Sequence, residues 1–148
     1  MRILGLTTLI LAASLAGAAT PVLPEGSFTG TAAWRGPSGA TGAYAVERTF
    51  SGTTVTSHYA WTEPQAREET ITLTFAMKPS ESGFDVLDGK NAVVGKGYCY
   101  DDACAYRATF GPVTVDETLR WSAGSMVAVG QKTGPGFSVV WKETLKSR

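Results

Sequence analysis

The chain has 148 residues, with 13 basic and 13 acidic side chains and a formal net charge of zero. That length is enough for one domain of ordinary size. Because nucleic acids and anionic membrane surfaces both attract concentrated positive charge, and no long basic run occurs here, we expect neither as a partner.

The first residues have the pattern of a secretory signal peptide. Arg2 precedes an apolar run from Ile3 to about Leu15, and the small residues 16–18 follow. The alternative is a membrane anchor, but the run is too short to span a bilayer comfortably and no charged stop-transfer block follows it. No cysteine near the cleavage region could carry a lipid. We therefore predict that residues 1–19 are a signal peptide and that residues 20–148 form a single exported domain, periplasmic or extracellular, without a membrane anchor.

After an extended lead-in over residues 21–26, the sequence alternates between apolar and polar side chains. Period two over five or more residues is typical of a strand with one dry and one wet face. Threonine, valine and aromatic residues, which favour strands, dominate these runs. The clearest runs are Tyr44-Val46-Arg48-Phe50, Val55-Ser57-Tyr59-Trp61, Ile71-Leu73-Phe75-Met77, Val115-Glu117-Leu119-Trp121 and Phe137-Val139-Trp141.

Glycine, proline, serine and aspartate residues separate these runs at short intervals, as in the loops of an antiparallel meander. No segment has a convincing helical period, and residues 64–69 would form at most one helical turn. We predict an all-β fold, an antiparallel up-and-down meander of about 8–10 strands closed into a barrel, since closure removes exposed strand edges. A two-sheet sandwich is the alternative.

The only two cysteines, Cys99 and Cys104, lie in the stretch GYCYDDACAY. A two-residue turn at Asp101-Asp102 would place Cys99 directly opposite Cys104 on the neighbouring strand, at a distance that suits a disulfide. A redox dithiol usually has two residues between its cysteines, and a zinc site needs three or four ligands. We predict a hairpin disulfide, no metal site, and a solvated acidic turn in preference to a calcium site at Asp101-Asp102.

No catalytic constellation is visible. The sequence has no nucleophile elbow, no phosphate-binding loop and no dinucleotide fingerprint. The only histidine, His58, falls on the polar side of its run, so it faces solvent, a structural partner or a polar lumen; a general base or haem ligand is the alternative. Glu117 with Asp116 is interpreted as strand surface, and residues 68–69 as an exposed loop end. A pair of catalytic carboxylates stays open, but we expect no enzyme activity and no cofactor.

Aromatic side chains fall mostly on the apolar side of their runs. They either pack a core or line a cavity, because barrels of this size often hold one small ligand. In the second case the aromatic side chains supply apolar contact, and Arg48, Tyr59 or Tyr106 meets the polar end of the ligand. The candidate ligand-binding residues are Tyr44, Arg48, Tyr59, Trp61, Phe75, Tyr106 and Trp121.

Three short stretches resemble the calycin-type barrels, the group that includes lipocalins, fatty-acid-binding proteins and nitrobindin-like haem barrels. They are Phe28-Thr-Gly-Thr-Ala-Ala-Trp34-Arg-Gly36 with Gly42 to Phe50 near the start, and Phe137-Ser-Val-Val-Trp141-Lys-Glu-Thr-Leu145 near the end. The resemblance implies a barrel with its mouth at one end that binds a small apolar or amphipathic molecule. Nitrobindin-like barrels hold haem through a late histidine, and no histidine follows His58 here.

Two functions from different classes are therefore predicted. The first is an exported barrel, expected to be monomeric, that binds a small apolar ligand in its interior. The second is a secreted protein-interaction module, such as a hydrolase inhibitor, that presents a loop or its extended N-terminus to a protein partner. Interior volume separates them, because a ligand barrel needs a connected cavity of a few hundred Å³ whereas an inhibitor has a filled core.

Overall fold

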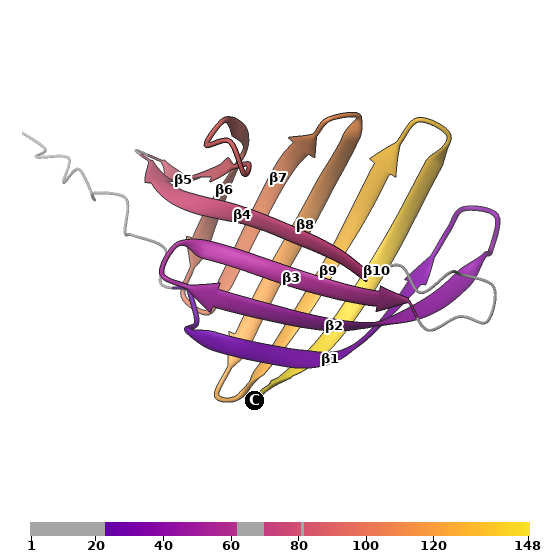
Figure 1. Ribbon diagram of the computed structural model, residues 1–148, viewed down its shortest axis with the longest axis horizontal. Coiled ribbons are helices and arrows are strands. Elements are labelled where there is room, and N and C mark those ends of the chain that lie inside the picture. The colour runs from indigo at the N-terminus through magenta and orange to yellow at the C-terminus, as the bar shows by residue number, and fades with distance from the viewer. Residues whose placement is uncertain (1–22, 62–69, 81) are drawn as a thin grey trace, which may run out of the picture.

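The computed structural model describes residues 23–61, 70–80 and 82–148, and the regular elements in those ranges are all strands. Each strand pairs antiparallel with the next along the chain, and β1 also pairs with β10, which closes the barrel (Figure 1). The predicted all-β, up-and-down barrel is confirmed. The strands are β1 (Gly26–Arg35), β2 (Thr41–Ser51), β3 (Thr54–Trp61), β4 (Thr70–Ser80), β5 (Gly83–Leu87), β6 (Val93–Tyr100), β7 (Ala103–Phe110), β8 (Val113–Ser122), β9 (Ser125–Gly134) and β10 (Phe137–Ser147).

The alternation seen in the sequence becomes an inner and an outer face. On β2, for example, Tyr44, Val46, Arg48 and Phe50 are buried, and the residues between them are more exposed. His58 lies on the outer face of β3, where its Nδ1 is 2.9 Å from the hydroxyl oxygen of Thr72. The prediction that His58 could face a polar lumen is wrong. The adjacent residues Ser57 and Tyr59 point inward, so His58 points outward.

One half of the barrel is filled with side chains. It lies toward the β2–β3 and β8–β9 turns and the C-terminus. Residues 23–25 lie at this end, where Leu23 is buried and the Glu25 carboxylate accepts a hydrogen bond of 2.9 Å from the Gly52 N–H. Large buried apolar side chains of the interior include Phe28, Phe50, Val55, Phe75, Met77, Phe84, Val86, Leu119, Met126 and Leu145. They form the hydrophobic core of the domain.

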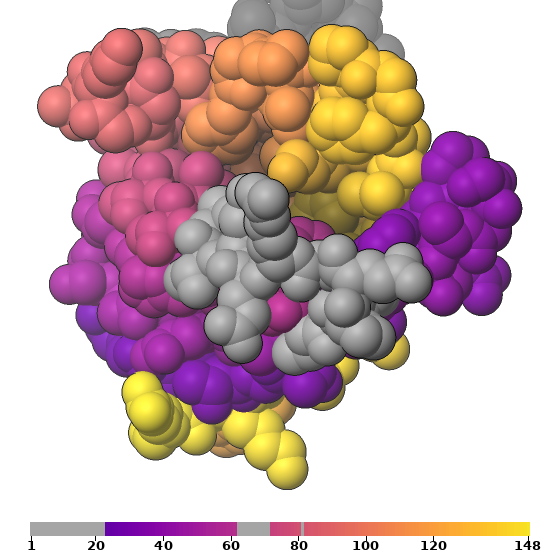
Figure 2. Space-filling model, turned by 45° about the vertical axis from the view of Figure 1, so that its right-hand side comes forward, coloured from indigo at the N-terminus to yellow at the C-terminus, as the bar shows by residue number. Residues whose placement is uncertain are grey.

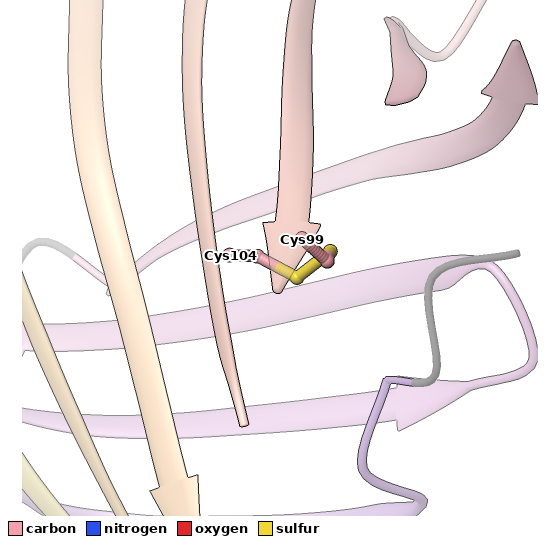
Figure 3. Close-up of a disulfide and its surroundings, with 2 residues drawn as sticks. All are labelled: Cys99 and Cys104. Atoms are coloured by element: carbon pink, nitrogen blue, oxygen red, sulfur yellow. A yellow bond between two sulfur atoms is a disulfide. The ribbon is translucent and has the colours of Figure 1, made fainter. Parts of the chain in front are cut away.

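The predicted disulfide joins Cys99 at the end of β6 to Cys104 at the start of β7 (Figure 3). The two residues lie directly opposite each other, and Asp101 has a positive φ of 50° in the turn between them. Aspartate tolerates that left-handed conformation better than most residues do. The disulfide therefore pins the β6–β7 hairpin at the filled end of the barrel.

The predicted signal peptide, residues 1–19, and the predicted helical turn at residues 64–69 lie outside the described residues. Within the described ranges, no helix is long and apolar enough to cross a membrane.

Candidate functional site: an internal cavity above a buried ion cluster

The other half of the barrel is hollow. A cavity of about 460 Å³ lies among residues at the ends of the strands that meet the β1–β2, β7–β8 and β9–β10 turns. Figure 2 shows the surface hollowed on this side, between the strands drawn in yellow and the β1–β2 hairpin drawn in purple. The volume is in the range of small-molecule sites, which is about 300–1,000 Å³. The described residues that line it are Trp34, Tyr44, Tyr59, Trp61, Leu73, Tyr106, Phe110, Val113, Val115, Glu117, Lys132, Phe137, Val139, Trp141 and Glu143.

The wall of the cavity is mainly aromatic. Tyr44 packs against Tyr59 and Trp61, with ring centroids 5.7 Å and 4.8 Å away respectively. Trp34 and Trp141 lie opposite each other on the paired strands β1 and β10. Aromatic rings present large apolar faces at low conformational cost, so they suit the binding of a flat or chain-like apolar body.

A cluster of charged side chains forms the inner end of the cavity, between the hollow and the filled half. Arg48 from β2 donates two hydrogen bonds to Glu117 of β8, from Nη1 at 2.7 Å and from Nη2 at 2.6 Å. Its Nε also forms an ion pair of 2.8 Å with Oε2 of Glu143 on β10. All three side chains are at most 2% exposed. Buried charges are stable only when they are paired in this way.

Two tyrosines complete the cluster. The Tyr44 hydroxyl donates to Oε1 of Glu143 at 3.0 Å, and the Tyr106 hydroxyl donates to Oε1 of Glu117 at 2.9 Å. Both tyrosines also line the cavity. Their rings therefore belong to the aromatic wall and their hydroxyl groups to the polar inner end.

Burial and mutual charge set the protonation of this cluster. Burial, with the Glu143 carboxylate second, raises the pKa of Tyr44 far above its usual value, and burial likewise raises the pKa values of Tyr59 and Tyr106. Burial also raises the pKa of Glu143, and the Glu117 charge adds to this effect while Arg48 opposes it. Burial by itself lowers the pKa of Arg48, but the Glu117 carboxylate outweighs this effect, and the pKa lies well above the ordinary value. The guanidinium and the phenols therefore keep their protons at neutral pH.

Gly130 makes room for one wall of the cavity. A Cβ at this position of β9 would overlap the ring of Trp141 and lie 2.6 Å from the Asp116 carbonyl oxygen. Without a side chain at Gly130, the Trp141 indole can lie against β9. The indole Nε1 atoms of Trp34 and Trp141 are buried, and neither has a hydrogen-bond partner among the described residues. Because these nitrogen atoms have almost no accessible surface, the two indoles contribute apolar ring atoms to the cavity wall.

The structure brings together four of the seven candidate ligand-binding residues around the cavity, namely Tyr44, Tyr59, Trp61 and Tyr106. Arg48 lies behind them and holds the two glutamates. Phe75 is core: it is 2% exposed, and its ring lies 5.5 Å from that of Tyr106. Trp121 lies at the filled end, next to the β8–β9 turn.

The interpretation of Glu117 as strand surface is wrong. Its carboxylate is buried because it faces inward on β8, on the same side as Val115 and Leu119. Glu143 was not predicted either. It continues the inward series Phe137, Val139 and Trp141 on β10, so the same period-two pattern contained the signal.

The described residues contain no group of three or more histidine, cysteine, aspartate or glutamate side chains that could hold a metal ion. The charged cluster is made of one cation and two carboxylates, and Arg48 occupies the position between them.

Fold and site together define a closed antiparallel β-barrel with a ligand-sized cavity, aromatic at its wall and charged at its inner end. The structure is similar to that of the S-type phycobiliprotein lyase CPES from Guillardia theta, with a TM-score of 0.65 over 84% of this chain and 88% of the lyase chain. Sequence identity is 9%, so the likeness concerns the fold. The closed up-and-down barrel agrees with the predicted calycin-type barrel in its general form. No family model matches the sequence, and no curated protein matches it either.

Proposed function

We propose that the protein is an exported binding protein that holds a small amphipathic molecule inside its barrel. The observation that carries the proposal is the cavity of about 460 Å³, which is walled by aromatic side chains and ends at buried polar groups. The filled interior expected of a protein-interaction module is absent from this half of the barrel. A binding role also needs no catalytic group.

The cavity wall indicates the body of the ligand. Contact with tryptophan, tyrosine and phenylalanine rings favours a largely apolar or aromatic molecule, and burial of its surface contributes about 25 cal/mol per Å² before ordering costs.

Export is supported by the pattern of residues 1–19 and by the Cys99–Cys104 disulfide, since disulfides persist in oxidising compartments. The intact mass of the protein purified from its own host tests this part of the proposal. A chain that still carries residues 1–19 would contradict it.

Binding is tested with a neutral fluorescent dye, N-phenyl-1-naphthylamine, and by native mass spectrometry of the protein from its host. Three of the four tryptophans line the cavity, so we expect dye binding to quench their emission. A matched pair of variants locates the site, because Val139 lines the cavity and the adjacent Val140 lies on the outer face, 49% exposed. We expect Val139→Trp to weaken dye binding about tenfold or more and Val140→Trp to leave it unchanged. Equal effects of the two variants, or no saturable binding together with a bare native mass, would overturn the proposal.

A further inference from the structure

Resting on the proposed function, we propose that the inner end of the cavity is a receptor for a cationic head group. An alkylammonium, an amidinium or a protonated nitrogen heterocycle would enter head first, and the Glu143 carboxylate would be its counter-charge. The volume of the cavity alone does not indicate this chemical class of ligand.

The balance of charge in the cluster favours a cation. The cluster contains two carboxylates and one guanidinium, and all three side chains are buried. Both carboxylates line the cavity, whereas Arg48 is not among the described residues that line it. A molecule that reaches the inner end therefore meets the negative side of the cluster. Because water is largely excluded there, an added positive charge is attracted more strongly than it would be at the surface.

The hydrogen-bonding groups at the inner end also favour a cation that donates protons. The Tyr44 and Tyr106 hydroxyl groups already donate their protons to Glu143 and Glu117. Glu117 accepts three hydrogen bonds from described residues, but Oε2 of Glu143 has only the ion pair with Arg48 Nε and no well-directed hydrogen bond. Arg48 Nε likewise has no well-directed hydrogen bond, but Arg48 is not among the described residues that line the cavity, so the lining member of this pair is an acceptor and suits a head group that donates a proton.

The aromatic wall next to Glu143 favours a cation as well. Tyr44 donates to Glu143, and its ring packs against Tyr59 and Trp61. Cations bind over the faces of such rings, and aromatic cages recognise ammonium groups in this way. Carboxylate and rings thus favour the same charge at the same place.

The positive charge that lines the cavity lies elsewhere. Lys132 is exposed, and its Nζ is 5.9 Å from the centroid of Phe137, which is itself 41% exposed at the mouth. A carboxylate at the inner end of the ligand would meet Glu117 and Glu143 instead. An anionic head group is therefore disfavoured there.

The experiment compares three molecules that share a ten-carbon chain and differ in head group: decylamine, decanol and decanoate. Each is used at neutral pH, where the amine is protonated, to displace N-phenyl-1-naphthylamine from the mature protein with its disulfide intact. We expect decylamine to displace the dye at a concentration about tenfold lower than decanol does, as one charge-assisted hydrogen bond allows. Decanoate should be the weakest of the three.

Two variants identify the counter-charge. Glu143→Gln keeps an acceptor for Tyr44 and leaves Arg48 paired with Glu117, and it should abolish the preference for the amine while neutral dye still binds. The matched control is Glu47→Gln, which removes an outer-face carboxylate of β2 that pairs with Arg148 at 3.2 Å. This control should keep the preference for the amine.

The outcomes separate the two proposals. Equal displacement by the three molecules, or tighter binding of decanoate, would overturn the cationic head group and leave the binding cavity intact. A preference for the amine that survives in Glu143→Gln would overturn the role of Glu143. If Glu143→Gln does not fold, the head-group series on the unchanged protein still decides the charge. Failure of the dye itself to bind would overturn the proposed function and this inference with it.

Discussion

Arg48 on β2 and Glu117 on β8 are joined across the inside of the barrel by two hydrogen bonds of 2.7 and 2.6 Å. The strands β1, β10 and β9 separate β2 from β8 along one side of the barrel, so the bridge links walls that share no backbone pairing. Paired guanidinium–carboxylate bonds are short and geometrically specific. The bridge therefore holds the polar inner end of the cavity in a defined position.

Removal of the guanidinium should cost far more than the loss of one contact. Arg48→Met leaves the Glu117 and Glu143 carboxylates buried without their cation, and we expect the free energy of unfolding to fall by about 3–5 kcal/mol. Urea denaturation followed by tryptophan fluorescence measures this change. The control is Arg148→Met, which breaks an exposed ion pair with Glu47 and should cost less than about 1 kcal/mol. Similar losses in both variants would contradict the structural role of the buried cluster.

The stability of the protein should fall as the pH rises above about 4.5, the ordinary pKa of glutamate. Burial raises the pKa of Glu143 in the folded state, so between the two values the folded chain holds a proton that the unfolded chain has released. The contribution of this proton is fully present below pH 4.5 and is lost as the pH rises through the folded pKa. Unfolding free energies measured at a series of pH values should show this slope, and Glu143→Gln should remove it. An identical slope in the variant would assign the effect to other groups.

Gly130 should control the space available to a ligand. Gly130→Ala places a methyl group where the Trp141 ring now lies and close to the Asp116 carbonyl oxygen, so both the ring and the β9 backbone must shift. We expect weaker dye binding, an altered tryptophan emission spectrum and some loss of stability. Gly89→Ala is the control, because a Cβ there meets no atom within 4 Å. Unchanged dye affinity in Gly130→Ala would show that the cavity adapts to the displaced ring.

The disulfide should stabilise the barrel without shaping the cavity. Reduction, or the double change Cys99→Ala with Cys104→Ala, should lower the free energy of unfolding by about 2 kcal/mol, since the closed loop is short. Dye affinity should not change, because the disulfide lies at the filled end of the barrel. Urea denaturation and dye titration of the reduced protein measure the two effects. Two free thiols in the unreduced protein, seen by non-reducing mass spectrometry, would contradict the pairing.

The wall of the barrel could be read from the sequence because it depends on local geometry. Successive side chains of a strand point to opposite faces, so the runs around Tyr44 and Tyr59 revealed which residues face inward. The cysteine pairing was equally local, since a two-residue turn brings Cys99 opposite Cys104. The same pattern placed Glu117 and Glu143 inward, but the role of a carboxylate in an apolar series cannot be inferred until its partner is known.

That partner was decided by the tertiary structure alone. The meeting of Arg48 with Glu117 and Glu143 depends on the tilt and stagger with which three distant strands close into one barrel, and no local pattern encodes these quantities. The division of the interior into a filled half and a hollow half also depends on how the strands close into the barrel. Phe75 and Trp121 point inward like Tyr59 and Trp61, yet neither is among the described residues that line the cavity. Thus the sequence by itself determined the strands, their faces and the hairpin disulfide, and the closure of the barrel decided which inward residues surround a cavity, because only closure brings distant strands face to face.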